Sequence, residues 1–507
     1  MVKLVAREIL PALTHIVNLS ISHSEFPSLW KIAKVVPLLK KGDPLNAKNY
    51  RPVALLPIFS KIMEKTVFQQ LIEYLDSNRL LNPNHHGARH GHNTATALIQ
   101  MYDQWAEQVD DGMMVGVMLI DLSAAFDMVD HPLLLKKLEL FGLDVKAVNW
   151  FQSYLSTRSQ SVCIDGCLSP AVAIECEVPQ GSILGPLLYI LFTDDIPELV
   201  HDHPVSVATP APFCSECGST VCYVDDCTYS HGSKDPVELS ETLSIQYSRI
   251  SSYMAANKLV INADKTHLLV MGTKSTAARR AEVSFQADQH TVTPTSTEKL
   301  LGANIFQDLK WKEHLLRSRQ SLVNQLTSRI NGLIKVSARS PVTTRLMVAN
   351  GIFMSKLCYL IQLWGGAEKY LLKALQVLQN RAARAVTRKS WFTSTRVLLR
   401  ECNWLSVNQL VFYQTVLTTH KIVKSGTPLY LARKMSLNHP YRTRQATEGS
   451  IRFGEAFEGT SSITGNSFCY TGTLSYNSLP ASIRAAKTLQ TFKFKLKKWI
   501  HSNIPID

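Results

Sequence analysis

The stretch Val221-Cys222-Tyr223-Val224-Asp225-Asp226-Cys227-Thr228-Tyr229 places two adjacent carboxylates between two short runs of β-favouring residues. This pattern predicts a tight hairpin, with strands over 220–223 and 227–229 and the two acids at its tip. Taken alone, an Asp-Asp pair in a turn is ordinary turn chemistry facing solvent. The pair indicates a function only if further acidic residues come close to it.

A third carboxylate comes from a segment well upstream. Residues 113–120 form an unbroken apolar run, too short to span a membrane, which predicts a buried strand. The run ends directly in Asp121, with Asp127 and Asp130 close behind. Mg²⁺ prefers oxygen ligands, so a strand and a hairpin that present three carboxylates together could hold a pair of such ions. Two ions about 4 Å apart stabilise both the attacking and the leaving oxygen of a phosphoryl transfer.

A third motif, Val178-Pro179-Gln180-Gly181-Ser182-Ile183-Leu184-Gly185-Pro186, lies between the other two. With the segments 121–127 and 223–226, in this order, it resembles the reverse transcriptases of non-LTR (LINE-type, jockey/CR1-like) retrotransposons. The resemblance covers residues 10–310 strongly and the remainder weakly. Its further motifs are Phe26–Lys31, Pro37–Asp43, Asn49–Val53, Asn257–Thr266 and Lys299–Gly302.

The resemblance implies an α+β fold of the right-hand polymerase type, with fingers, an antiparallel palm sheet, a helical thumb and a mainly helical C-terminal extension. We expect residues 1–30 to be an N-terminal helical extension of the fingers and 24–306 the reverse transcriptase domain. Residues 307–400 are expected to form the basic thumb, and 401–507 an extension of unknown role.

The resemblance also assigns roles to individual residues. Asp121, Asp225 and Asp226 are the expected catalytic residues and the ligands of two Mg²⁺ ions, for which Mn²⁺ could substitute. The expected substrate-binding residues are Lys40, Lys41 and Arg51 at the triphosphate, Gln180 and Gly181 near the substrate or templating pair, and Lys265 near the leaving pyrophosphate. For each cation the alternative is an exposed surface charge.

Phe126 is the residue expected to choose the sugar. It follows Asp121 by five residues, where reverse transcriptases resemble one another in carrying a bulky aromatic. A ring beneath the sugar of the incoming nucleotide would exclude a 2′-hydroxyl. The alternative is a plain core position beside Leu122.

Basic residues are concentrated in one part of the chain. The chain carries a net charge of +14, and residues 311–400 contain sixteen Lys or Arg but only two acidic residues. The rest of the chain is balanced, so this segment is expected to track a polyanion. We expect Arg381, Arg384 and Arg388 to bind nucleic acid; a solvated helical face is the alternative.

Two clusters raise the question of zinc. Four histidines lie within 85–92, but their spacing fits no usual zinc framework. Cys214, Cys217, Cys222 and Cys227 could supply four thiols, although the last two fall on the predicted hairpin strands. Ala88 stands where the family commonly has an aromatic, which puts template packing at that position in question.

The composition of the chain indicates a folded protein and limits the cellular compartments in which it is expected. A chain of 507 residues with 45% hydrophobic residues has ample material for a folded core. Its ten cysteines form no short secreted framework, and the first twenty residues are predicted to be an amphipathic helix rather than a signal peptide. We therefore expect an intracellular protein, in nucleus and cytoplasm as a ribonucleoprotein, without membrane association or a targeting signal.

Several helices are predicted from periodicity and capping residues. They cover 61–75 with Ser60 as N-cap, a segment opened by Asp130-His131-Pro132 and closed by Gly142, a helical region from Trp311 onward, and a terminal helix over 488–500. Residues 440–477 are expected to be rich in loops.

These observations favour an RNA-directed DNA polymerase that extends a primer 3′-OH with dNTPs on an RNA template, using a DNA primer. The chain is expected to come from a truncated non-LTR element, because it begins about where the polymerase domain begins. The alternatives are a catalytically decayed remnant that only binds nucleic acid, an intron-maturase-like protein, or an RNA-templated RNA polymerase.

Overall fold

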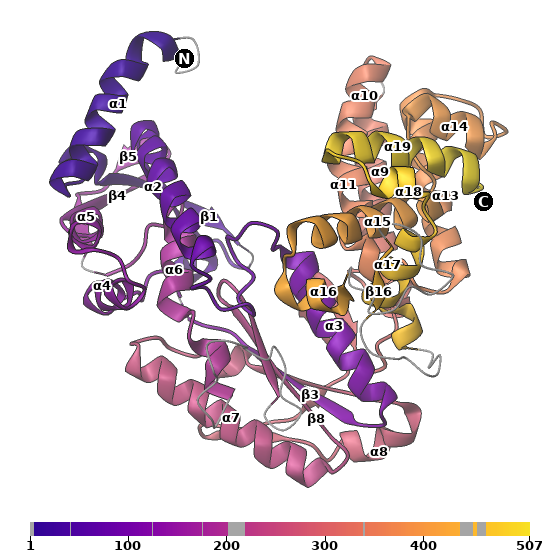
Figure 1. Cartoon of the computed structure of the whole chain (residues 1–507), viewed down its shortest axis with the longest axis horizontal. Helices are drawn as coiled ribbons and strands as arrows, with labels where there is room; N and C mark the ends of the chain where they lie inside the picture. The colour runs from indigo at the N-terminus through magenta and orange to yellow at the C-terminus, as the bar shows by residue number, and fades with distance from the viewer. Residues whose placement is uncertain are drawn as a thin grey trace.

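The computed structural model describes residues 5–40, 42–123, 125–174, 176–200, 218–337, 340–436, 450–453 and 463–506 of the chain. Two arms rise from a base that carries a five-stranded mixed sheet (Figure 1). One arm is built from the N-terminal residues and the other from the C-terminal helices, so the two ends of the chain lie on opposite arms.

The N-terminal arm holds a small sheet in the order β2-β1-β4-β5, with β6 also pairing β4. Strand β1 runs antiparallel to β2 and parallel to β4. Its elements are α1 (Ala6–His23), β1 (Ile32–Leu39), β2 (Tyr50–Leu55), α2 (Ile58–Ser77), α4 (His131–Leu140), α5 (Val145–Leu155), β4 (Arg158–Ile164), β5 (Cys167–Leu168), β6 (Val172–Ile174) and α6 (Gly185–Thr193).

The base is a sheet in the order β12-β9-β3-β8-β7. Strands β7, β8, β3 and β9 are antiparallel neighbours, and β12 adds parallel to β9. The elements here are α3 (Thr94–Asp110), β3 (Met114–Ile120), β7 (Ser219–Tyr223), β8 (Asp226–Ser233), α7 (Pro236–Ala256), β9 (His267–Met271), α8 (Ala277–Arg280), β10 (Phe285–Ala287), β11 (His290–Val292), β12 (Pro294–Thr295), β13 (Thr297–Leu300) and β14 (Ala303–Phe306).

Strand β3 is apolar throughout because both of its faces are covered. Val115 and Val117 belong to a core that includes α3 and the C-terminal helices. Met114 and Met118 point the other way, into a core shared with α6 and α7. Gly116 also faces α7, since a Cβ there would lie 2.9 Å from the Leu243 side chain. The predicted buried strand over 113–120 is confirmed.

The C-terminal arm is helical and is fastened to the base through α3. It contains α9 (Leu322–Ser337), α10 (Val342–Ala349), α11 (Ser355–Leu357), α12 (Ile361–Trp364), α13 (Lys369–Thr387), α14 (Thr395–Cys402), α15 (Val407–Ser425), α16 (Leu429–Lys434), β15 (Met435–Ser436), β16 (Arg452–Phe453), α17 (Phe468–Asn477), α18 (Ala481–Arg484) and α19 (Leu489–Asn503). Buried Asp103 of α3 accepts the backbone N–H groups of Phe468 and Cys469 at 3.2 and 3.0 Å. A carboxylate is favourable there because the N-terminal N–H groups of a helix lack internal partners.

Some predicted boundaries are wrong. Helix α2 begins at Ile58 after Pro57, and Ser60 lies inside it, where its hydroxyl donates to Glu64 at 2.8 Å instead of capping the helix. Residues 468–477, expected to be loop, form α17 with Ser467 as N-cap. By contrast, the helical region predicted from Trp311 onward is confirmed; it opens with a π-turn over Glu313–Arg317 and continues as α9.

Other predicted elements are confirmed. Asp130 caps α4, and Gly142 follows it with a φ of +83°. The terminal helix α19 runs over Leu489–Asn503 with Thr488 as N-cap. None of the described helices is long and apolar enough to cross a membrane.

Candidate active site

The predicted hairpin is present and holds Asp225 and Asp226 at its tip. Tyr223 pairs with Asp226 across β7 and β8, leaving Val224 and Asp225 as a two-residue turn. Val224 has a φ of +58°, which a β-branched residue adopts only when neighbouring structure enforces it. The loop before α3 supplies that support, because Cys222 donates to the Asn84 carbonyl at 3.0 Å and accepts from His86 at 2.8 Å.

The same loop explains the histidine cluster. His85 and His86 are fully buried, and burial lowers the pKa of both rings, so they are neutral. The His86 ring lies 2.8 Å from Gln100 and 3.3 Å from Thr96, which are hydrogen-bonding partners. Among the described residues, no three His, Cys, Asp or Glu side chains gather as a metal site. Here the histidines support the acidic turn through packing.

Asp121 reaches the same edge of the sheet from β3. Ile120 pairs with Cys227 in the β3–β8 ladder, so the residues that follow and precede them, Asp121 and Asp226, are brought together. Asn262 donates to the Asp121 carbonyl at 2.8 Å and fixes the backbone there. The Asp121 carboxylate lies 3.1 Å from Lys265 Nζ. Asp121, Asp226 and Lys265 line one pocket of about 290 Å³.

Burial and the charges of neighbouring carboxylates raise the pKa values of the two hairpin acids, Asp225 and Asp226. Burial, followed by the charges of Asp225 and Asp121, raises the pKa of Asp226 to about 6. Burial and the charge of Asp121 also raise the pKa of Asp225, while Arg51 and Lys40 act in the opposite direction. Two of the predicted triphosphate-binding cations, Lys40 and Arg51, therefore lie close enough to act on the carboxylates. Asp121, Asp225 and Asp226 at this end of the sheet are called the acidic edge below. Lys41 falls outside the described residues.

The donor chemistry of this edge fits Mg²⁺, because the residues offer hard carboxylate oxygens with unbalanced negative charge. Asp121 is paired with Lys265, and the described carboxylates do not gather closely enough to form a complete metal-ligand cluster by themselves. The thiols offer no alternative in the described residues: Cys222 and Cys227 face each other across the hairpin as buried packing groups. Cys214 and Cys217 lie outside the described residues.

Gln180 and Gly181 lie where the second motif meets β2. The Gln180 side-chain amide donates to Asp127 at 2.8 Å, and the Gln180 backbone carbonyl accepts from the Ala54 N–H at 2.8 Å. Gly181 has a φ of +125°, and a Cβ there would lie 2.5 Å from the Ala54 carbonyl oxygen. Only glycine allows this approach, so the structure gives Gly181 a packing role.

The substitution Gly181→Ala should therefore destabilise the protein by about 2–3 kcal/mol, because it combines backbone strain with a steric clash. Gly112→Ala is the matched control, since Gly112 also has a positive φ, +79°, but open space around it. Thermal midpoints of both variants check this. Equal midpoints would contradict the role of the Ala54 contact.

Phe126 packs on Tyr189 of α6, with ring centroids 4.9 Å apart. Its backbone carbonyl accepts from Val178, which ties it to the second motif. The Tyr189 hydroxyl is buried without a hydrogen-bond partner among the described residues. Burial and the charge of Asp225 raise the pKa of Tyr189, so these rings adjoin the acidic edge.

The three predicted nucleic-acid-binding arginines lie on α13 and just after it. This helix belongs to the C-terminal arm, whereas the three carboxylates lie on the base sheet. Arg381 donates to Asn331 of α9 at 3.1 Å. Arg384 donates to the carbonyls of Trp391 and Thr393, so it holds a loop of its own arm. Arg388 has a φ of +58° and ends α13.

Sequence reasoning missed a second basic surface. Lys421 and Lys424 of α15 and Lys487 are exposed and line a pocket of about 790 Å³ together with His90 and His92 of the loop before α3. Only the i, i+3 spacing of Lys421 and Lys424 on one helix face could have signalled it.

The family described as "Reverse transcriptase (RNA-dependent DNA polymerase)" matches residues 38–305 of this chain. The chain belongs to the reverse transcriptase family. Every motif from Pro37–Asp43 to Lys299–Gly302 falls within that match or at its border. The right-hand polymerase fold expected from the motifs is confirmed by this membership.

Curated relatives of this reverse transcriptase chain come from non-LTR elements. It is 27% identical over 425 residues to the probable RNA-directed DNA polymerase from transposon BS of Drosophila melanogaster, covering 82% of this chain and 45% of that protein. It is 27% identical over 384 residues to the RNA-directed DNA polymerase from mobile element jockey of Drosophila funebris, covering 75% and 40%. The chain thus spans less than half the length of these relatives, and the jockey-like resemblance is confirmed.

Solved structures of telomerase are more distant. The apo telomerase of Candida tropicalis is 10% identical, with a TM-score of 0.42 over 78% of this chain and 67% of that one. The assignment of this chain to the reverse transcriptase family therefore rests on the family match over residues 38–305.

Proposed function

We propose that this chain is an RNA-directed DNA polymerase of a non-LTR retrotransposon, which extends a primer 3′-OH with dNTPs on an RNA template. The observation that supports it best is the meeting of Asp121 with Asp225 and Asp226 at one sheet edge, within electrostatic reach of Arg51 and Lys40. Three acids beside two cations suit a reaction in which a triphosphate is attacked at its α-phosphorus.

Each residue has a defined task in this proposal. Asp121, Asp225 and Asp226 would hold Mg²⁺ or Mn²⁺, which when bound lowers the pKa of the 3′-hydroxyl and neutralises charge on the transferred phosphoryl group. Lys40, Lys41 and Arg51 bind the triphosphate, and Gln180 positions the substrate through its link to Asp127. The new bond joins the primer 3′-oxygen to the α-phosphorus while the bond from that phosphorus to the pyrophosphate oxygen breaks. The 3′-hydroxyl proton passes to water, and Lys265 can donate a proton to the leaving pyrophosphate.

The primer–template backbone needs cations beyond the active edge. We propose that Lys421, Lys424 and Lys487 contact phosphates along the pocket shared with the loop before α3. This surface lies next in sequence to the segment that supports the Asp225 turn, because His90 and His92 come four and six residues after His86. Arg381, Arg384 and Arg388 remain a second proposed contact in the C-terminal arm.

Neutralising Lys421, Lys424 and Lys487 together, with glutamine, should weaken primer–template binding and reduce the slope of log K against log[salt]. Each lost phosphate contact should lower the slope by about 0.9. The triple glutamine variant of Arg381, Arg384 and Arg388 tests the second proposed contact in the same assay; Arg381 and Arg384 also donate hydrogen bonds within the arm. If the arginine variant changes the slope and the lysine variant does not, the phosphate backbone of the primer–template follows α13, and the proposed lysine contacts are contradicted.

A primer-extension assay tests the function directly. Purified chain, an RNA template, a DNA primer, dNTPs and Mg²⁺ should give templated DNA, and omission of the metal should stop it. Binding without extension under all these conditions would support the alternative of a nucleic-acid-binding remnant.

A further inference from the structure

The loop that joins α13 to α14 presents two large aromatic side chains to solvent. Trp391 is 71% exposed and Phe392 is 93% exposed. Among the large hydrophobic side chains of the described residues, only Leu45 is as exposed as Phe392. Exposed aromatic surface of this kind marks a binding site when its surroundings complement a ligand.

The Trp391 ring is held in place although it faces solvent. The Arg384 guanidinium lies over the ring, 4.7 Å from its centroid, and donates to the Trp391 carbonyl at 3.0 Å. One face of the indole is therefore covered by a cation, and the remaining surface is open. A ring that is already ordered loses little conformational entropy when a flat ligand stacks on it.

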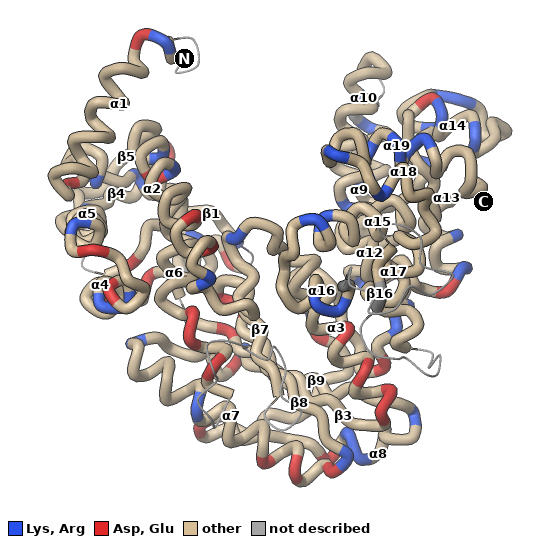
Figure 2. Tube along the Cα trace, viewed as in Figure 1, with Lys and Arg blue, Asp and Glu red and all other residues tan. Residues whose placement is uncertain are grey.

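The surroundings of the loop are strongly basic. Residues 381–403 contain six Lys or Arg and one acidic residue, Glu401, which pairs with Lys389 at 3.2 Å. Arg396 and Arg400 of α14 are exposed and have no ion-pair partner within the part of the chain that the structure describes. Figure 2 shows the blue segments gathered around α14.

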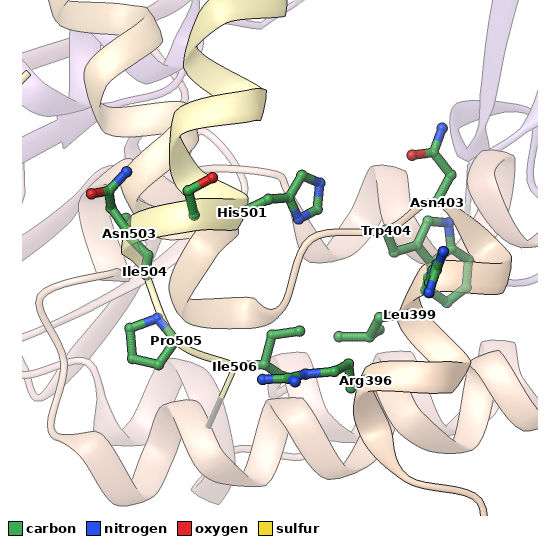
Figure 3. Close-up of a pocket in the computed structure, with 11 residues that line it drawn as sticks. Arg396, Leu399, Asn403, Trp404, His501, Asn503, Ile504, Pro505 and Ile506 are labelled. Atoms are coloured by element: carbon green, nitrogen blue, oxygen red, sulfur yellow. The ribbon is translucent and has the colours of Figure 1, made fainter. Parts of the chain in front are cut away.

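Arg396 and Arg400, which follow this loop in sequence, also line a pocket. The pocket has a volume of about 710 Å³, and Trp404, Asn403, His501 and Asn503 complete its polar and aromatic lining. Figure 3 shows Trp404 and Asn403 on one side of it and Asn503 and Pro505 on the other, with Arg396 beside Ile506 at its lower edge. Its size is within the range of ligand pockets, and its charged residues are all cations or histidine.

We propose that the Trp391–Phe392 loop and the α14 arginines form a binding site for single-stranded nucleic acid outside the polymerase cleft. Bases would stack on Trp391 and Phe392, while Arg396 and Arg400 bind phosphates. Stacking on aromatic rings combined with cations along the backbone is how proteins hold single strands without reading sequence. A duplex fits poorly, because its bases already stack on one another.

The position of the site indicates which strand it takes. Helix α14 lies on the side of the C-terminal arm that faces away from α1 and α2 (Figure 1). Resting on the proposed polymerase function, the strand is template RNA that lies outside the primer–template duplex. An acidic protein would match the charge but would offer no base faces.

The test measures binding of two ten-nucleotide probes, oligouridylate and an abasic strand of the same length. An excess of unlabelled primer–template hairpin fills the cleft, and EDTA prevents synthesis. The variants are Trp391→Ala/Phe392→Ala, Phe392→Ala alone, and Arg396→Gln/Arg400→Gln. Leu140→Ala is the control, because Leu140 is 81% exposed at the end of α4 on the other arm.

The double aromatic variant should bind oligouridylate at least about tenfold more weakly, with abasic binding unchanged. The arginine variant should weaken both probes and reduce the salt slope by about 0.7 per lost contact. Phe392→Ala alone should show part of the aromatic effect, which excludes misfolding as its cause because that ring is almost fully in solvent. Affinity within twofold of wild type, or an equal loss with both probes, overturns the proposal.

Primer extension by the same preparations separates this inference from the proposed function. If primer extension occurs but the aromatic variants bind oligouridylate as the wild type does, the single-strand site is contradicted and the polymerase proposal stands. No extension, with the expected binding pattern, removes the polymerase proposal and leaves the single-strand site standing.

Discussion

Asp225→Asn should lower the rate of primer extension by at least about 10³-fold and leave primer–template affinity unchanged. The amide keeps the size of the side chain but removes one carboxylate from the edge formed with Asp121 and Asp226. The affinity should persist because the proposed backbone contacts lie on other elements. Single-turnover extension and filter binding of the same preparation measure the two quantities.

The fold of this variant should survive. Burial and Asp121 raise the pKa of Asp225, so the ionised carboxylate is less favourable in the folded protein than in water. Its removal should keep or raise the thermal midpoint. Asp130→Asn is the matched control, since Asp130 caps α4 and pairs with Lys258 but is not on the acidic edge. Near-wild-type extension by Asp225→Asn would contradict the assignment of the catalytic carboxylates.

Phe126→Ala should raise ribonucleotide incorporation by about 10²-fold relative to deoxynucleotide incorporation. The ring is tied to Tyr189 at 4.9 Å and adjoins the acidic edge through that residue. We expect the sugar of the incoming nucleotide to lie against it, with no room and no partner for a 2′-hydroxyl. The ratio of kcat/KM for dCTP and CTP opposite a template guanine measures the effect.

Phe141→Ala is the control variant for the packing that Phe126→Ala loses. Phe126 and Phe141 are both partly buried against the same core, so the two variants share a cost in stability. Only Phe126→Ala should change the sugar ratio. A ratio that stays the same in both variants would mean that Phe126 is an ordinary core residue.

The acidic edge could be predicted from sequence because its parts are local. The apolar run before Asp121 favours a buried strand, and the Asp225-Asp226 pair between β-favouring residues favours a turn. Helix α4 was likewise predictable from Asp130 and Gly142. The meeting of the two acidic segments is a consequence of one ladder, in which Ile120 pairs with Cys227.

The features that were missed depend on contacts between distant segments. Ser60 looks like an N-cap in sequence, but Pro57 already starts the helix and Glu64 takes the hydroxyl. Helix α17 is polar enough to look like a loop until Asp103 of α3 binds its N-terminus. The basic surface of Lys421 and Lys487 exists only because α15 and the segment before α19 meet the loop at His90.

The fastening of the C-terminal arm to α3 has a consequence for how such genes can change. Asp103 binds α17, Asp110 binds Thr464, and the Tyr102 hydroxyl donates to the Leu309 carbonyl at 2.5 Å, all from one helix that also covers a face of β3. A premature stop codon after Arg400 would remove partners of α3 and uncover the sheet that carries the carboxylates. The codons for residues 401–507, in which no catalytic motif is found, are therefore expected to be under the same purifying selection as those of the Asp225-Asp226 turn, and recombination should not exchange them as a separate cassette.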